Sequence, residues 1–125
     1  MSAFYVVVGA AFGAPSRFLV DQYLRKFIKY PYGILIINVL GSFIIGLTVA
    51  HVPVGTFAFY HAHGTNVIHY LIAVGFAGAF TTWSTFILDL YLAFELKQYR
   101  TAIMNLLFSL ILGLCAVTLG MYLAP

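Results

Sequence analysis

The sequence predicts an all-α membrane protein, a single domain over residues 1–125 with four transmembrane helices. Of its 125 residues, 63% are hydrophobic and 7% are charged, and the mean hydropathy is +1.03. This is the composition of a chain that lies in lipid rather than in water. The apolar residues also form runs long enough to cross a bilayer as helices. We therefore expect a multi-pass protein of the cell (plasma or inner) membrane.

The four apolar runs define the expected helices. They cover residues 3–24, 31–52, 67–95 and 99–123. Gly9 and Gly13 in the first run have GxxxG spacing, which lets a neighbouring helix approach closely, and we expect ordinary helix packing there. Four short helices hardly enclose a pore by themselves, and the many small residues favour assembly into a dimer.

The basic residues lie beside the apolar runs. The loops carry five lysines and arginines: Arg25, Lys26, Lys29, Lys97 and Arg100. The net charge of +3 therefore does not indicate a nucleic-acid partner. Because basic loops stay cytoplasmic, the distribution predicts one preferred orientation, with both termini outside.

Histidines gather in the loop of residues 53–66, where His61 and His63 stand, with His51 and His69 on either side. A His-x-His pair can contribute to a metal site, but no third ligand has a suitable spacing. We expect these to be surface histidines.

The third run is a poor simple helix. Residues Gly75 to Phe86 read GFAGAFTTWSTF, and the glycines and hydroxyl pairs weaken helix propensity and compete for backbone hydrogen bonds. We expect a break from Gly78 to Thr82. In a bilayer, irregular backbone is tolerated where it is buried in protein, lines a wet cavity or binds an ion. The break therefore indicates a binding or permeation site.

Polar residues on the other helices leave two interpretations open. Asn38 offers two N–H donors, either to an anion or to a neighbouring helix. Asn105 and Ser109 are four residues apart, with Gly113 one turn further, so they form a polar stripe. That stripe is either a pore wall or a hydrogen-bonded helix interface. Arg17 and Asp21 share a helix face. They belong either to a salt-bridge ladder near the membrane interface or to a functional site.

These residues resemble the signature of the small fluoride channels, the Fluc family, also called CrcB. Gly75 to Phe86 is similar to that family's Gly-Phe-x-Gly-Gly-x-Thr-Thr-Phe-Ser-Thr-Phe. Gly13 to Phe18 resembles its Gly-Ala-x-x-Arg-Tyr, and Tyr32 to Phe43 resembles its Gly-Thr-Leu-x-x-Asn-x-x-Gly-Ser-Phe. With Asn105 to Gly113, the likeness spans nearly the whole chain.

The resemblance implies a passive, fluoride-selective channel that lets F⁻ leave the cytoplasm and so supports fluoride resistance. It implies an antiparallel, dual-topology dimer with two pores. A homodimer is one form, and a heterodimer with an oppositely oriented homologue is the other, which the charge distribution suggests. The partners are then fluoride and membrane lipid, with no nucleic acid.

The resemblance also assigns the site residues. It implies a pore lined by Asn38, Trp83, Ser84, Thr85, Phe86, Asn105 and Ser109. Arg17 would stand in a wet vestibule, and Asp89 replaces a family glutamate. The backbone carbonyls of Gly78 and Thr81 from both subunits would hold one structural Na⁺ at the dimer interface.

This chain departs from the family at Trp83, where the first motif phenylalanine is expected, and at Ile87, where a serine is common. A small proton-coupled exporter is a less favoured alternative, because it needs a carboxylate deep in a helix and Asp21 is peripheral. A non-conducting assembly subunit is a further alternative. It is less favoured because helix packing alone would not require hydrogen-bond donors on both the third and the fourth apolar runs. An enzyme is not expected, since no nucleophile with a base, metal set or cofactor loop can be assembled.

Overall fold

The computed structural model of the chain describes residues 2–29, 32–50, 67 and 69–125. The elements in order are α1 (Ser2–Leu24), α2 (Tyr32–Val49), η1 (His69–Ala77), α3 (Gly78–Phe80), α4 (Trp83–Glu95) and α5 (Tyr99–Leu123). Within the described residues, four helical spans are long and apolar enough to cross a membrane, the third running from Tyr70 to Glu95. The predicted all-α, four-helix membrane fold is confirmed. The histidine loop and the far end of the second expected helix lie outside the described residues.

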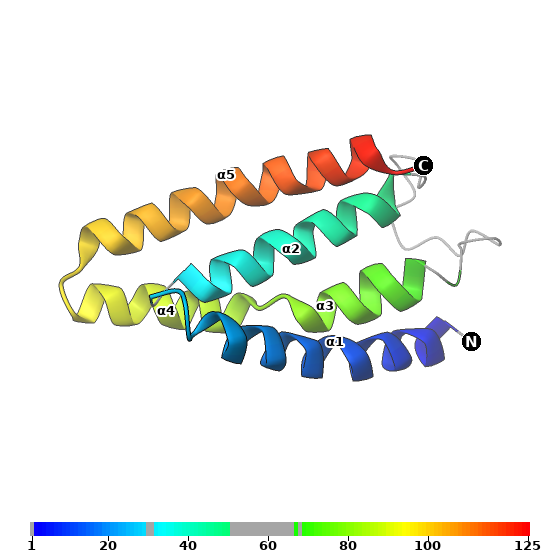
Figure 1. Ribbon diagram of the computed structural model, residues 1–125, viewed down its shortest axis with the longest axis horizontal. Coiled ribbons are helices and arrows are strands. Elements are labelled where there is room, and N and C mark those ends of the chain that lie inside the picture. The colour runs from blue at the N-terminus through cyan, green and yellow to red at the C-terminus, as the bar shows by residue number, and fades with distance from the viewer. Residues whose placement is uncertain (1, 30–31, 51–66, 68) are drawn as a thin grey trace.

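Two closely packed helix pairs make up the bundle (Figure 1). α2 lies along α5, and α1 lies along η1 and α3, while α4 continues the third segment toward the α4–α5 turn. The N and C termini lie at the same end of the bundle. The third segment begins as a π-helix over His69–Ala77, a form that the sequence did not predict.

Glycines bring α1 onto the third segment. A Cβ on Gly9 would lie 2.8 Å from the backbone nitrogen of Phe76, and a Cβ on Gly13 would lie 3.1 Å from the Phe76 carbonyl carbon. Cβ atoms essentially never lie under 3.0 Å from another heavy atom, and a Cβ on Gly13 would also lie directly against the Phe76 carbonyl oxygen, so a side chain at either position does not fit. The expected packing role of the two glycines is confirmed.

α2 and α5 run in the same direction. The Ser42 hydroxyl lies 3.7 Å from the position of a Cβ on Gly113, and Gly46 faces the backbone of Val117. Both pairs are separated by the same 71 positions in the sequence. This register puts Ser109 level with Asn38.

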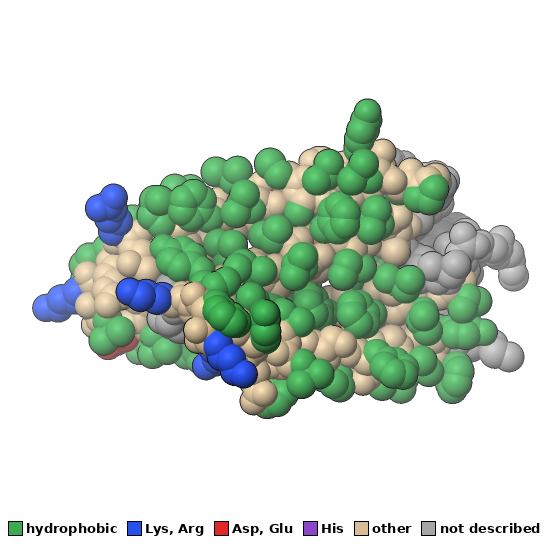
Figure 2. Space-filling model, viewed as in Figure 1, with side chains coloured by type: hydrophobic (Ala, Val, Ile, Leu, Met, Phe, Trp, Pro, Cys, Tyr) green, Lys and Arg blue, Asp and Glu red, His purple; other side chains and the backbone are tan. Residues whose placement is uncertain are grey.

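The buried core is small. Ile34, Ile37, Phe80 and Phe86 form its centre, and most other large apolar side chains of the described residues are exposed. Figure 2 shows apolar side chains over most of the visible face. In a chain of this hydropathy, such a surface suits lipid or a second subunit rather than water.

The basic residues mark one end. Figure 2 shows lysine and arginine side chains gathered at the end opposite the termini of Figure 1. Lys97 helps to form this end, because it takes a left-handed conformation (φ 56°) after α4. The N–H groups of Lys97 and Gln98 then donate to Phe94 O (2.9 Å) and Ala93 O (2.8 Å), the pattern of a Schellman motif. Both basic loops therefore lie toward the same end of the bundle.

Candidate functional site

The third segment is broken between α3 and α4, within the range that the sequence predicts. The Thr81 N–H and hydroxyl both donate to the Ala77 carbonyl, at 2.9 and 3.0 Å. Thr81 (φ −81°, ψ 154°) and Thr82 (φ −137°, ψ 121°) then take extended conformations. Helical hydrogen bonding therefore reaches Thr81 and stops at Thr82.

Asn38 of α2 bonds to the break with both ends of its amide. Its Oδ1 accepts from the Thr82 N–H at 2.9 Å, and its Nδ2 donates to the Thr82 carbonyl at 3.1 Å. A side-chain amide has the donor and acceptor of a peptide unit, so it replaces a backbone partner at this point. Asn38 therefore bridges α2 and the third segment. The second N–H of its side-chain amide remains available to another acceptor.

The break also releases two backbone carbonyls. In an unbroken helix, the Gly78 carbonyl would accept from the Thr82 N–H, but that N–H goes to Asn38. The Thr81 carbonyl precedes the Thr82 N-cap of α4, so it lies outside the helical ladder. A Cβ on Gly78 would meet nothing within 4 Å, so this position is open. Uncommitted carbonyl oxygens at an open position fit the ligand preference of a hard cation.

The first turn of α4 offers donors to an anion. Trp83 begins the helix, and Ser84 and Thr85 follow in its first turn, while the Thr82 side chain makes no capping hydrogen bond. The N–H groups of a first turn have no intrahelical partner and form the positive end of the helix dipole. The backbone N–H groups of this turn therefore face the break, and the Ser84 and Thr85 hydroxyls lie on the same short stretch.

Three buried polar atoms lie at the break and on α5. The Thr82 Oγ1, the Asn105 Oδ1 and the Ser109 Oγ are buried with no hydrogen-bond partner among the described residues. Asn105 is 1% exposed. Leaving a polar atom buried and unpaired costs about 1–3 kcal/mol. Buried polar atoms of this kind are suited to hydrogen bonding with an ion or with a second protein subunit.

Trp83 and Phe86 lie close together but in different surroundings. Their ring centroids are 5.9 Å apart with planes tilted by 48°. Phe86 belongs to the core at 5% exposed, whereas Trp83 is 76% exposed. Ser84, on the same turn as Trp83, is also exposed. Within one subunit, the two rings therefore do not line a common space.

Two cavities lie at the basic end of the bundle. The larger, about 690 Å³, is lined by Asp89 among others, and the smaller, about 280 Å³, is lined by Arg17. Asp21, Arg25 and Thr85 line both. The two sequence-predicted vestibule residues thus border adjoining spaces that share the Thr85 side chain.

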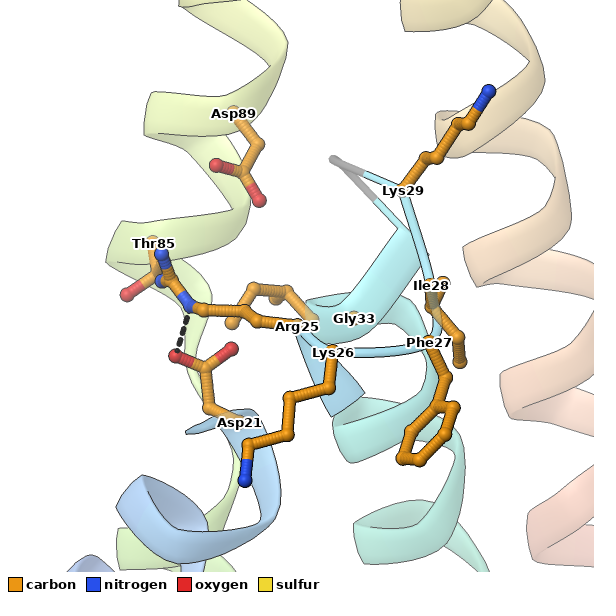
Figure 3. Close-up of a pocket in the computed structure, with 10 residues that line it drawn as sticks. Asp21, Arg25, Lys26, Phe27, Ile28, Lys29, Gly33, Thr85 and Asp89 are labelled. Atoms are coloured by element: carbon orange, nitrogen blue, oxygen red, sulfur yellow. Dashed lines mark hydrogen bonds and ion pairs between the residues drawn. The ribbon is translucent and has the colours of Figure 1, made fainter. Parts of the chain in front are cut away.

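An ion pair stands between these cavities. The Arg25 Nε donates to the Asp21 Oδ2 at 2.9 Å, and Figure 3 shows Arg25 crossing the space toward α4, where Thr85 and Asp89 project inward. Lys26 and Lys29 also border the larger cavity and point away from one another. A cavity with this surplus of cations attracts anions.

The family model described as CrcB-like protein, Camphor Resistance (CrcB), matches residues 4–121. The chain belongs to the CrcB family. A relative from Hahella chejuensis, named "Fluoride-specific ion channel FluC", is 37% identical over 118 residues, which cover 93% of this chain and 88% of the relative. A relative of the same name from Parabacteroides distasonis is 36% identical over 125 residues, covering 98% and 92%. The resemblance predicted from the motifs is confirmed at the level of the family.

Two features of this CrcB-family site are not predicted from the sequence. Thr82 was part of the expected break, but its pairing with Asn38 was not predicted, because the two residues lie 44 positions apart. The sequence places Arg25 on one helix face with Asp21 and uses the basic turn to predict topology, but it does not predict that Arg25 and Lys26 line the larger cavity. A turn rich in cations beside the motif arginine of the first helix was the available signal.

Proposed function

We propose that this chain is a passive, fluoride-selective channel through which F⁻ leaves the cytoplasm. The observation that carries the proposal is a broken membrane helix with a buried, unpaired hydroxyl at Thr82, together with the buried, unpaired polar atoms of Asn105 and Ser109 on α5, among the described residues. The names of the CrcB-family relatives, which are those of fluoride channels and not of enzymes, support the same activity.

The donor set suits fluoride. Fluoride is small and tightly hydrated, so a pore must replace its water with hydrogen-bond donors and positive dipole ends while still letting it leave. The pore residues that we propose are Asn38, Trp83, Ser84, Thr85, Phe86, Asn105 and Ser109. The hydroxyls and amides donate hydrogen bonds, and the two aromatic rings offer their positive edges.

The vestibule collects the anion. Arg17 lines the smaller cavity together with Thr85, which also belongs to the first turn of α4. The cationic side chain raises the local fluoride concentration, and the helix end then accepts the ion. Asp89, at 6% exposed, borders the same route, where a carboxylate either carries a proton or accepts from a neighbouring donor.

The pore is completed by a second subunit. Trp83 is 76% exposed and lies on a membrane helix directly after the break, so in one subunit its ring edge has no enclosed space to face. An antiparallel partner that packs against the break would cover Trp83 and Ser84 and enclose two pores. A homodimer supplies this partner, and a heterodimer with an oppositely oriented homologue supplies it equally well.

The break also suits one structural Na⁺ at the dimer interface. The carbonyls of Gly78 and Thr81 from both subunits would hold it. A bound Na⁺ neutralises the negative ends of these carbonyls in a low-dielectric setting. The open space around Gly78 is compatible with the close approach of a second copy of the same segment.

Fluoride efflux from liposomes tests the channel. Vesicles containing this chain alone should release fluoride rapidly to an electrode, with chloride efflux as the selectivity control and without dependence on a proton gradient. Ser109→Ala should slow the release, whereas Thr118→Val should not, because the Thr118 hydroxyl bonds within its own helix to Leu114 O at 2.9 Å. No efflux from folded protein, alone or mixed with a homologue of opposite charge bias, would refute the proposal.

A further inference from the structure

The hydrogen bond of the Thr82 N–H decides whether the Gly78 carbonyl is free. Thr82 N–H has two candidate acceptors: the Gly78 carbonyl, which a regular helix would supply, and the Asn38 amide, which the fold supplies at 2.9 Å. The bond goes to Asn38. The state of the Gly78 carbonyl is thus set by a side chain from a different helix.

We infer that Asn38 is a positioning residue that holds the break open and keeps the Gly78 carbonyl available to a cation. The inference goes beyond a pore role for Asn38 and rests in part on the proposed Na⁺ site. The geometry supports it twice over, because the Asn38 Nδ2 also holds the Thr82 carbonyl at 3.1 Å. A residue held at both its N–H and its carbonyl cannot rotate back into a helix.

The surrounding contacts fit this role. Thr82 is 8% exposed, so its polar backbone needs a protein partner in place of water. Gly41, one turn after Asn38, lies directly against the Thr81 methyl, so α2 meets the break closely enough for a short amide to reach it. The Ser42 hydroxyl donates to the backbone carbonyl of Asn38 at 2.9 Å, within α2, and so leaves the Asn38 side-chain amide to Thr82.

The first experiment measures stabilisation of the purified protein by Na⁺ as a thermal-midpoint titration in detergent. The proteins are wild type, Asn38→Leu, Asn105→Leu and Ser42→Ala. Asn38→Leu should raise the Na⁺ concentration of half-effect about tenfold, the change expected when one charge-assisted contact is lost. Asn105→Leu removes a buried amide on α5 and should slow fluoride efflux with the Na⁺ response intact. Ser42→Ala should change neither.

An unchanged Na⁺ midpoint in Asn38→Leu, with wild type responding, would overturn the inference. If wild type does not respond to Na⁺, the proposed sodium site fails, and the positioning role is decided by NMR of the same proteins. In Asn38→Leu, the Thr82 amide should exchange about tenfold faster with solvent, or the Gly78 carbonyl ¹³C resonance should move downfield as the helix closes. A variant that shows neither change would refute the role of Asn38 independently of sodium.

Discussion

Gly9 of α1 and Gly75 of η1 lie face to face, so that a Cβ on either residue would stand 3.0 Å from the Cα of the other. The contact joins the first helix to the segment that carries the break. Small residues replace the missing hydrophobic driving force between helices in lipid by letting backbones approach closely. The position of the break relative to Arg17, two turns further along α1, therefore depends on this contact.

Gly9→Ala should destabilise the subunit. The added methyl would meet the Phe76 nitrogen at 2.8 Å, and such overpacking costs about 1–3 kcal/mol. The matched control is Gly113→Ala, where the methyl would meet Ser42 Oγ at an ordinary 3.7 Å and should gain about 0.5–1 kcal/mol of helix propensity. Thermal midpoints in detergent measure both, and a stability loss that is equal in the two variants would contradict the glycine contact.

The sequence predicted those features that depend on local composition. Hydropathy marked the four spans, and the glycines and hydroxyls from Gly78 to Thr82 marked the break, because each weakens a helix where it stands. The pairing of Asn38 with Thr82 depends on the register of two segments far apart in the chain. No local pattern carries that information.

The different surroundings of Trp83 and Phe86 could not be predicted from the sequence either. In a soluble protein, hydrophobic periodicity separates a buried face from an exposed one. In a membrane chain, lipid-facing and core-facing side chains are both apolar, so Trp83 and Phe86 look alike in sequence. The structure separates them, at 76% and 5% exposed. It also puts Thr85 at the vestibule, which the motif alone places only in the pore.

Trp83→Phe should alter fluoride conduction with little effect on the fold of the subunit. If the indole N–H donates to fluoride, its loss should weaken fluoride affinity about fivefold, the value of one hydrogen bond. If the larger ring narrows a pore, the variant should instead conduct faster. Single-channel current and its dependence on fluoride concentration separate the two. Phe86→Ala is the contrasting variant, because emptying a core site costs about 3–5 kcal/mol, and unchanged affinity and conductance in Trp83→Phe would refute both roles.

Asp21→Asn should increase fluoride entry. The Asp21 carboxylate neutralises Arg25 at 2.9 Å where the two cavities adjoin, so its removal adds one net positive charge beside the ion's path. At about 8 Å in a water-like dielectric, one charge is worth about 0.5 kcal/mol, which corresponds to a two- to threefold faster efflux at low fluoride. The gain should fade at high ionic strength because salt screens the charge.

Arg25→Gln provides the reverse test for the vestibule. It removes the cation and leaves Asp21, so efflux should fall by a similar factor, again most strongly in low salt. Lys97→Gln is the control, since Lys97 carries the same charge at the same end of the molecule but does not line either cavity. If all three substitutions change the rate in proportion to net charge alone, the vestibule has no specific role.

The chain should insert in one orientation, with the termini outside. Five of its six lysines and arginines lie in the two loops at one end, and the segments at the other end carry none. Basic loops are retained on the cytoplasmic side, so a reporter active only outside the cytoplasm should work when fused to the C terminus, and a cytoplasmic reporter should not. Replacing Arg25, Lys26 and Lys29 by Gln should produce both orientations.

The orientation of the chain decides how it assembles, because an antiparallel dimer of a chain with fixed orientation requires a homologue that inserts the other way. Equal activity of the two reporters on the unmodified chain would instead favour an antiparallel homodimer, built from both orientations of the same sequence.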